Sequence, residues 1–246
     1  MAFDQGALWY DALANRPGRL EREGPLLTRC LAAAPTPRVV DIACGTGLHA
    51  HYLASQGAQV TAFDLSPGMV AFARARRPHP VVQYETGDMR SVTGGPYGLA
   101  ICLGNSLALI NDEAGLQAVF HSVAEALEPD GRFLLQLVNG NAPGAAEPKQ
   151  RVEQVSLPDE AGDLVVIKTL VPHEGRTLLS IAYFVLDGDE PSTVAESAVL
   201  RHWTLDELDA AATGAGLTRT EIWGGFDASP FDTSVSGDLL VLYSRG

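Results

Sequence analysis

Two acidic residues, each at the end of an apolar run, are the residues of this chain best placed to do chemistry. Asp41 follows an apolar run and precedes two glycines, Gly45 and Gly47, while Asp64 ends the run 60–63. An apolar run followed by a tight turn and a helix-prone stretch predicts a strand, a turn and a helix, and glycine lets the turn backbone approach a ligand closely. Parallel strands of an open α/β sheet bring their carboxyl ends to one crevice, where ligands bind. We therefore expect both carboxylates at one site, where an acid suits the hydroxyls of a ribose.

The nature of the ligand depends on Asp41. The spacing Gly45-x-Gly47-x-x-Ala50 also fits the loose dinucleotide pattern, in which a pyrophosphate lies against the turn. An anionic side chain four residues before the turn would repel a pyrophosphate. A ligand with a cationic amino-acid part and no phosphate, such as S-adenosylmethionine (SAM), would be attracted. The pattern favours SAM over a nicotinamide or flavin, although a ligand-free α/β domain could carry the same turn.

The segment Asp41-x-Ala43-Cys44-Gly45-Thr46-Gly47 resembles motif I of the class I SAM-dependent methyltransferases. The resemblance covers 38–138 and 203–244 and implies a Rossmann-like α/β fold, in which a mostly parallel sheet ends in an antiparallel strand. The string 101–106, Ile-Cys-Leu-Gly-Asn-Ser, is similar to the glycine N-methyltransferase and small-molecule N-methyltransferase group. The cofactor-binding residues that this resemblance implies are Tyr10, Arg19, Asp41, Ala43, Gly45, Gly47, Asp64, Leu65, Met69, Gly87, Asp88, Met89 and Leu103.

Some of these positions have specific roles in the family. The resemblance implies that Asp88 hydrogen-bonds the adenine amino group and that Arg19, 22 residues before Asp41, binds the cofactor carboxylate. Arg16 and Arg22 compete for that role, and an arginine on a solvated helix face is the plain structural interpretation. Tyr10 would cover the pocket. Asp88 could also be a turn residue, because Gly and Asp are common turn formers, but its position as third in the series of strand ends favours the binding role.

Asn105 and His202 are the candidate catalytic residues. Asn105, after the fourth strand, could orient the nucleophile or line the pocket, or it could cap a helix. His202 could face the substrate as a general base, or it could be structural. His49 and His51 point in different directions on a helix, and no cluster has metal-ligand spacing, so we expect no metal.

The acceptor is expected to be a small-molecule amine or hydroxyl. Glycine-specific relatives carry an arginine where this chain has Val138, so glycine is a doubtful substrate. The triplet 88–90, a β-rich insert and the junction 201–204 resemble methyltransferases of amino sugars and other small metabolites. A larger acceptor could use the aromatic side chains Tyr183, Phe184, Phe226 and Phe231, although an aromatic residue at alternating strand positions more often belongs to a core.

An amine slightly outranks a hydroxyl as the acceptor, because an amine needs only its free base whereas a hydroxyl needs a general base. The alternatives to an enzyme of this kind are a non-catalytic SAM-binding protein and a nicotinamide-dependent oxidoreductase.

The elements that would position these residues follow from the hydrophobic pattern. Five apolar strands alternate with helices and predict a buried parallel sheet: 38–43, 60–64, 81–85, 99–103 and 133–138. The region 150–202 has four β-rich runs and no long helix, which predicts an antiparallel insert. A helix over 204–214 and strands over 217–223 and 238–244 complete the sheet. We therefore expect a helical arm or lid at 1–37, a SAM-binding domain at 38–140 and 203–246, and an insert at 141–202 that acts as a substrate lid.

Composition limits the class of partner. The 246 residues carry a net charge of −13, which argues against nucleic acid and anionic membranes as partners. The basic cluster 74–77 falls at a predicted helix end, where cations complement the helix dipole. Cys30, Cys44 and Cys102 show no paired spacing, the N-terminus does not look like a signal peptide, and no apolar run could span a membrane. We expect a cytoplasmic protein with a small-molecule substrate, and a homo-oligomer stays open.

Overall fold

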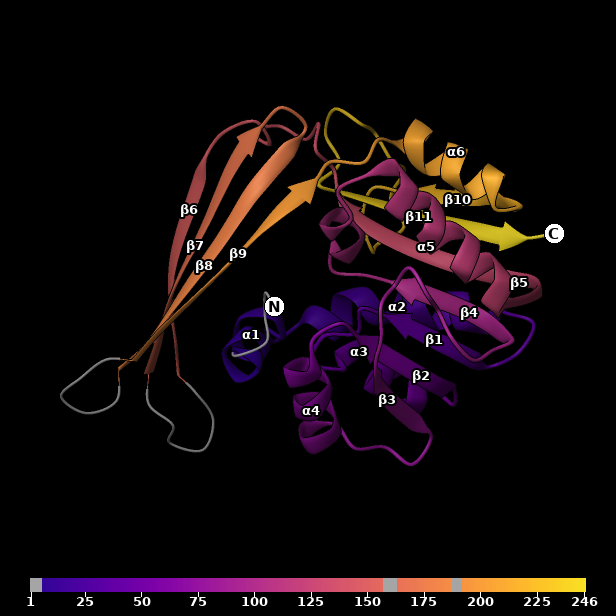
Figure 1. Ribbon diagram of the computed structural model, residues 1–246, viewed down its shortest axis with the longest axis horizontal. Coiled ribbons are helices and arrows are strands. Elements are labelled where there is room, and N and C mark those ends of the chain that lie inside the picture. The colour runs from indigo at the N-terminus through magenta and orange to yellow at the C-terminus, as the bar shows by residue number, and fades with distance from the viewer. Residues whose placement is uncertain (1–5, 157–162, 187–191) are drawn as a thin grey trace.

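The computed structural model describes residues 6–156, 163–186 and 192–246, so the N-terminal segment for which we expect no signal peptide lies outside the described residues. A seven-stranded sheet forms the centre of the α/β domain (Figure 1). Its strand order is β10 (Leu217–Trp223), β11 (Asp238–Arg245), β5 (Leu127–Val138), β4 (Tyr97–Cys102), β1 (Arg38–Ile42), β2 (Gln59–Asp64) and β3 (Val82–Thr86).

Strand direction in this sheet confirms the predicted fold class. The pairs β1–β2, β1–β4, β2–β3 and β4–β5 are parallel. β11 runs antiparallel to both of its neighbours, β5 and β10. The sheet is therefore mostly parallel with an antiparallel last strand, and the carboxyl ends of β1 to β5 share one edge.

Helices cover both faces of the sheet, as the apolar strands require. α2 (Arg19–Ala32), α3 (Leu48–Ser55) and α4 (Pro67–Arg76) pack on one face around Leu27, Leu53 and Val70. α5 (Glu113–Ala126) and α6 (Leu205–Gly214) cover the other face, where their side chains surround Phe120 and Phe133. None of the helices in the described part of the chain has the length and hydropathy needed to cross a membrane.

Local sequence explains where several helices begin. Ser66 caps α4 by accepting from the Met69 N–H, and Pro67 occupies the first helical position. Thr204 and Glu207 form a capping box at the start of α6, as predicted. Asp112 caps α5 by accepting from the Gly115 N–H at 2.7 Å.

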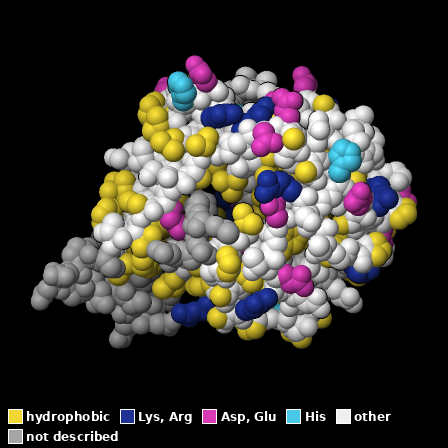
Figure 2. Space-filling model, in the orientation of Figure 1, with side chains coloured by type: hydrophobic (Ala, Val, Ile, Leu, Met, Phe, Trp, Pro, Cys, Tyr) yellow, Lys and Arg dark blue, Asp and Glu magenta, His cyan; other side chains and the backbone are white. Residues whose placement is uncertain are grey.

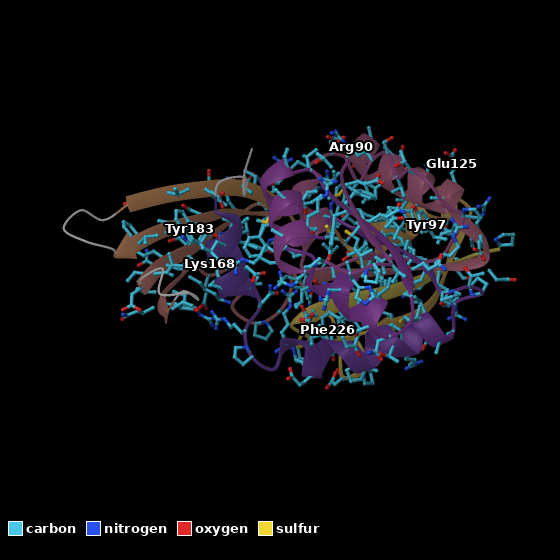
Figure 3. All side chains as sticks on the ribbon, turned by 90° about the horizontal axis from the view of Figure 1, so that it is seen from below. Arg90, Tyr97, Glu125, Lys168, Tyr183 and Phe226 are labelled. Carbon is cyan, nitrogen blue, oxygen red and sulfur yellow. The ribbon has the colours of Figure 1, made fainter. Side chains whose placement is uncertain are left out.

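The insert is a separate four-stranded antiparallel sheet in the order β6 (Lys149–Ser156), β7 (Asp163–His173), β8 (Arg176–Leu186) and β9 (Ser192–Arg201). α1 (Ala7–Ala14) lies between this sheet and the α/β domain (Figure 1). Trp9 and Leu13 of α1 pack on a core that includes Tyr183, which Figure 3 shows beside α1. The prediction that Tyr183 offers aromatic surface to an acceptor is therefore wrong, because its side chain is fully buried in this core.

One predicted strand boundary needs correction, whereas the structure only adds detail to the arm. The arm consists of two helices, because Pro17 and the left-handed Gly18 (φ +83°) interrupt it before α2. The strand predicted over 133–138 begins earlier, at Leu127, because Leu127 pairs with Tyr97 of β4.

Candidate active site

The turn after β1 brings the two predicted βα units together. Ala43, Gly45 and Gly47 have φ values of +57°, +55° and +82°, a conformation that favours glycine. A Cβ on Gly47 would lie 2.8 Å from ring atoms of Tyr84, so only glycine fits there. The Cys44 N–H donates to the Phe63 carbonyl at 3.0 Å, which ties the turn to β2.

Asp64 is held against this turn. Its Oδ2 accepts from the Gly45 N–H and its Oδ1 from the Ser66 N–H, both at 2.9 Å. Burial raises the pKa of Asp64, and these two hydrogen bonds limit the rise. The carboxylate of the second strand therefore lies at the glycine turn of the first, as the sequence predicts.

Asp41 is the most strongly perturbed carboxyl of the site. It is 1% exposed, and its Oδ2 is buried without a hydrogen-bond partner. Burial, and then the charge of Asp64, raise its pKa to about 8, against smaller lowering by the Ala50 N–H and Arg19. A buried carboxyl with one unpartnered oxygen and a raised pKa stays protonated unless a cation approaches it, so the site fits a ligand with a positively charged group.

The arm covers the glycine turn. A Cβ on Gly45 would lie 3.9 Å from the ring of Tyr10, and Tyr10 has a raised pKa, chiefly because it is buried. Arg77 fastens the arm by donating to Asp11 at 3.0 Å and to the Thr46 carbonyl at 2.7 Å. Asn15 donates to the Thr46 hydroxyl at 3.3 Å.

Arg19 is better placed than its two competitors to face the site. Its Nε lies 3.0 and 3.1 Å from the two carboxylate oxygens of Glu23, and its Nη1 donates to the Ala14 carbonyl at 3.0 Å. The charge of Arg19 also lowers the pKa values of Asp41 and Tyr10 relative to what burial alone would give. Arg16 instead pairs with Glu153 of the insert, and the Arg22 side chain is 65% exposed.

The remaining predicted cofactor residues fall into two groups, those at the surface or beside Asp64 and those that pack into the interior. The Gly87 N–H donates to the Asp64 carbonyl at 3.0 Å, and Leu65 is exposed. Asp88 is engaged by Arg90, which lowers its pKa and lies 3.0 Å from it through Nε. The side chains of three other predicted residues pack into the interior: Met69, Met89 and Leu103.

Asn105 braces the strand ends next to the cofactor turn. Its backbone is left-handed (φ +64°), and its N–H donates to the Gln136 Oε1 at 2.9 Å. Its side-chain Oδ1 accepts from the Val138 N–H, also at 2.9 Å. The sequence left open that Asn105 caps a helix, but its side chain makes no capping hydrogen bond among the described contacts. The side chain instead joins the ends of β4 and β5.

His202 lies apart from this turn. Its Nε2 is 2.8 Å from the Thr177 hydroxyl, and burial lowers its pKa, so the imidazole is neutral near pH 7. It lines a cavity of about 780 Å³ together with Asn139, Trp203 and Phe231.

The sequence did not single out Glu23, His49 or Gln136 as site residues. Glu23 and His49 are both buried, and the His49 Nε2 lies 2.7 Å from the Glu23 Oε2. Gln136 joins Asn105 to Asp238, to whose Oδ1 its Nε2 donates at 2.7 Å. The spacing of four residues between Arg19 and Glu23, which favours ion pairs on helices, was the one available signal.

Comparison with known proteins agrees with this geometry. Residues 39–131 match the Methyltransferase domain family. The chain is 29% identical over 208 residues to a dTDP-3-amino-3,6-dideoxy-alpha-D-glucopyranose N,N-dimethyltransferase of Streptomyces fradiae, a match that covers 81% of this chain and 77% of that protein.

Two solved structures share the fold. A SAM-dependent methyltransferase from Clostridium acetobutylicum superposes with a TM-score of 0.79 at 17% identity and covers 99% of each chain. SAM-bound CalS10, an amino pentose methyltransferase from Micromonospora echinaspora, gives a TM-score of 0.73 at 22% identity and covers 96% of each chain. The glycine turn, the paired strand-end acids and the strand order agree with these similarities, and the chain is a SAM-dependent methyltransferase with the Rossmann-like fold of class I.

Proposed function

We propose that this enzyme methylates an amine of a small, ring-shaped metabolite, with an amino sugar as the best acceptor class. The similarity to a sugar N,N-dimethyltransferase carries this proposal, because it extends over 81% of the chain, well beyond the SAM-binding segment. Val138 supports it, since this 54% exposed side chain at the end of β5 cannot bind the carboxylate of glycine.

Bound SAM supplies a methyl group that its sulfonium makes electrophilic. We assign Arg19 to the methionine carboxylate, Asp41 to the methionine ammonium and Asp64 to the ribose hydroxyls, as their positions around the turn support. Gly45 and Gly47 let the backbone come close to the ligand.

Other residues close and brace the site. Tyr10 covers the glycine turn, and Asp88 stays the candidate for the adenine amino group once it separates from Arg90. Asn105 fixes the ends of β4 and β5, where we expect the acceptor to enter. Orientation supplies most of the catalysis in this arrangement.

The lid assignment is also a proposal. α1 packs on the insert core and its Tyr10 lies near the glycine turn, which supports an arm and an insert that close over the site together. His202 and its cavity, between the insert and the start of α6, could hold the distal part of an acceptor. A neutral imidazole would also suit a general base if the acceptor were a hydroxyl.

A methyl-transfer assay tests the acceptor class. We expect turnover with amino sugars or their nucleotide conjugates, and little or none with glycine and sarcosine, because Val138 offers no cation. Radiolabelled SAM with a panel of amines and matched hydroxyl compounds measures this. Glycine turnover of about 1 per second or more would contradict the assignment, as would transfer only to hydroxyl compounds.

We further propose a homodimer formed through the outer face of the insert sheet. An antiparallel sheet normally has one polar face that faces solvent, but the middle of the outer face here carries only apolar and uncharged polar side chains. The inner face is covered by α1, and the middle of the outer face carries no charged side chain between Val165 and Val171 of β7. Its exposed apolar residues include Val152, Val171, Leu178 and Val199, and Figure 2 shows hydrophobic side chains gathered on the insert.

A second copy of the chain is the partner that best suits this face. Four strands about 4.8 Å apart and about ten residues long present roughly 600 Å², close to the ~800 Å² per partner of a standard interface. Sheet faces pack on each other in an aligned manner, and an uncharged face places no like-charged side chains opposite one another in the contact.

Introducing a charge into this face should separate the dimer. We expect the wild type to have twice the 26.0 kDa chain mass in light scattering and Leu178→Asp to be a monomer. Val235→Asp, an exposed apolar position in the α/β domain, is the matched control and should stay dimeric. A monomeric wild type at micromolar concentration would refute the dimer.

A cytoplasmic location is the last part of this proposal. Cys30, Cys44 and Cys102 are free and buried, which supports a reducing compartment. Cell fractionation with the native chain tests it.

A further inference from the structure

Glu23 forms a buried cluster between the arm and the helix that follows the glycine turn. It is only 4% exposed, and its carboxylate contacts the Arg19 Nε at 3.0 Å, the His49 Nε2 at 2.7 Å and the Arg22 Nη2 at 3.3 Å. Burying a carboxylate is costly unless it is well partnered. Glu23 is such a buried charge, and it binds Arg19, which faces the proposed cofactor site. This pairing calls for an explanation beyond stability.

The cluster fixes the plane of the Arg19 guanidinium. Nε is held by both oxygens of Glu23, and Nη1 donates to the Ala14 carbonyl at 3.0 Å. Within the described residues, these contacts leave Nη2 and one Nη1 hydrogen for a ligand, and a guanidinium binds a carboxylate with two parallel bonds. An arginine with a fixed plane loses less side-chain entropy when it binds.

His49 connects this cluster to the cofactor turn. His49 is buried in the first turn of α3, the helix that begins directly after Gly47. Its contact with Glu23 therefore ties α2 to the turn. Burial lowers the pKa of His49, which makes the ring neutral and a donor to Glu23. Burial alone would raise the pKa of Glu23, but His49 and then Arg19 lower it below its ordinary value.

We infer that Glu23, held by His49, is a positioning residue that orients Arg19 toward the carboxylate of SAM. The inference rests on the role proposed above for Arg19. It makes Glu23 a determinant of cofactor affinity that touches no part of the cofactor.

Calorimetry with two ligands separates positioning from folding. SAM carries the methionine carboxylate, whereas 5′-methylthioadenosine lacks it and retains the adenosine. We expect Glu23→Gln to weaken SAM binding about tenfold and to leave methylthioadenosine binding within about twofold. The KM for SAM should rise while kcat at saturating SAM stays unchanged. Glu21→Gln, an exposed change on the same helix, is the control and should bind both ligands like the wild type.

A double-mutant cycle with Arg19→Ala completes the test. If Glu23 acts through Arg19, the double variant should bind SAM no more weakly than Arg19→Ala alone. Equal losses for both ligands, additive losses in the cycle, or wild-type SAM affinity in Glu23→Gln would each overturn the inference.

The cycle also separates this inference from the proposed role of Arg19. An unchanged SAM affinity in Arg19→Ala would refute that role and the inference together, whereas a loss seen only in Arg19→Ala would refute the inference alone. If Glu23→Gln does not fold, Glu23→Asp keeps the charge but withdraws the carboxylate by one methylene. Glu23→Asp should then weaken SAM binding by less than about tenfold and leave methylthioadenosine binding unchanged. Losses of the same size for both ligands, or wild-type affinity for both, would overturn the inference.

Discussion

Replacing Asp64 with alanine should weaken SAM binding about 10- to 100-fold, or about 1–3 kcal/mol. The carboxylate is fixed by the Gly45 and Ser66 N–H groups at 2.9 Å, so its remaining lone pairs are directed before the ligand arrives. Without it, two ribose hydroxyls would be buried without partners. Titration calorimetry with SAM and S-adenosylhomocysteine measures the loss.

The matched control is Asp112→Ala, which also removes a carboxylate that accepts from a backbone N–H, at 2.7 Å from Gly115. Loss of that helix cap should cost about 1 kcal/mol of stability and leave SAM affinity unchanged. Unchanged SAM affinity in Asp64→Ala would contradict the ribose assignment. An equal loss in both variants would show that the effect is only one of stability.

The parts of the site that could be predicted from sequence are those set by local pattern. Asp41 and Asp64 end apolar strands, and the topology of parallel strands then places them at one edge of the sheet. The insert was predictable because its β-rich runs follow one another without a helix. Local signals also gave the capping box of α6, since Thr204 and Glu207 are three residues apart.

The parts that could not be predicted depend on contacts between distant segments. Glu23 and His49 meet across 26 positions, and Asn105 reaches Val138 across 33. Neither pairing has a signature in a single sequence. The early start of β5 needed its pairing with Tyr97, and the inward orientation of Met89 needed the core against which it packs.

Asp41 should make the stability of the unliganded enzyme fall as pH rises. Its carboxyl has a pKa of about 8 in the folded chain, because of burial and then Asp64, against an ordinary 3.8. Between these values the unfolded chain releases a proton that the folded chain retains. The free energy of unfolding therefore has its full value below pH 4 and decreases by up to about 1.4 kcal/mol per pH unit toward pH 8.

Asp41→Asn removes this titration while its amide oxygen can still accept from the Ala50 N–H. We expect the variant to be more stable than the wild type at pH 8 by roughly 5 kcal/mol, with a smaller difference at pH 5. Urea unfolding at both pH values measures this, and the exposed Glu85→Gln is the control that should leave the pH dependence unchanged.

Asp41→Asn should also bind SAM more weakly, because a neutral amide cannot pair with the methionine ammonium. A stability difference that does not grow with pH would show that Asp41 is ionised in the unliganded enzyme. Stronger SAM binding by the variant would show that the carboxylate does not face the cation. The expected result makes Asp41 a group that costs stability in the empty enzyme and is stabilised by the cofactor it binds.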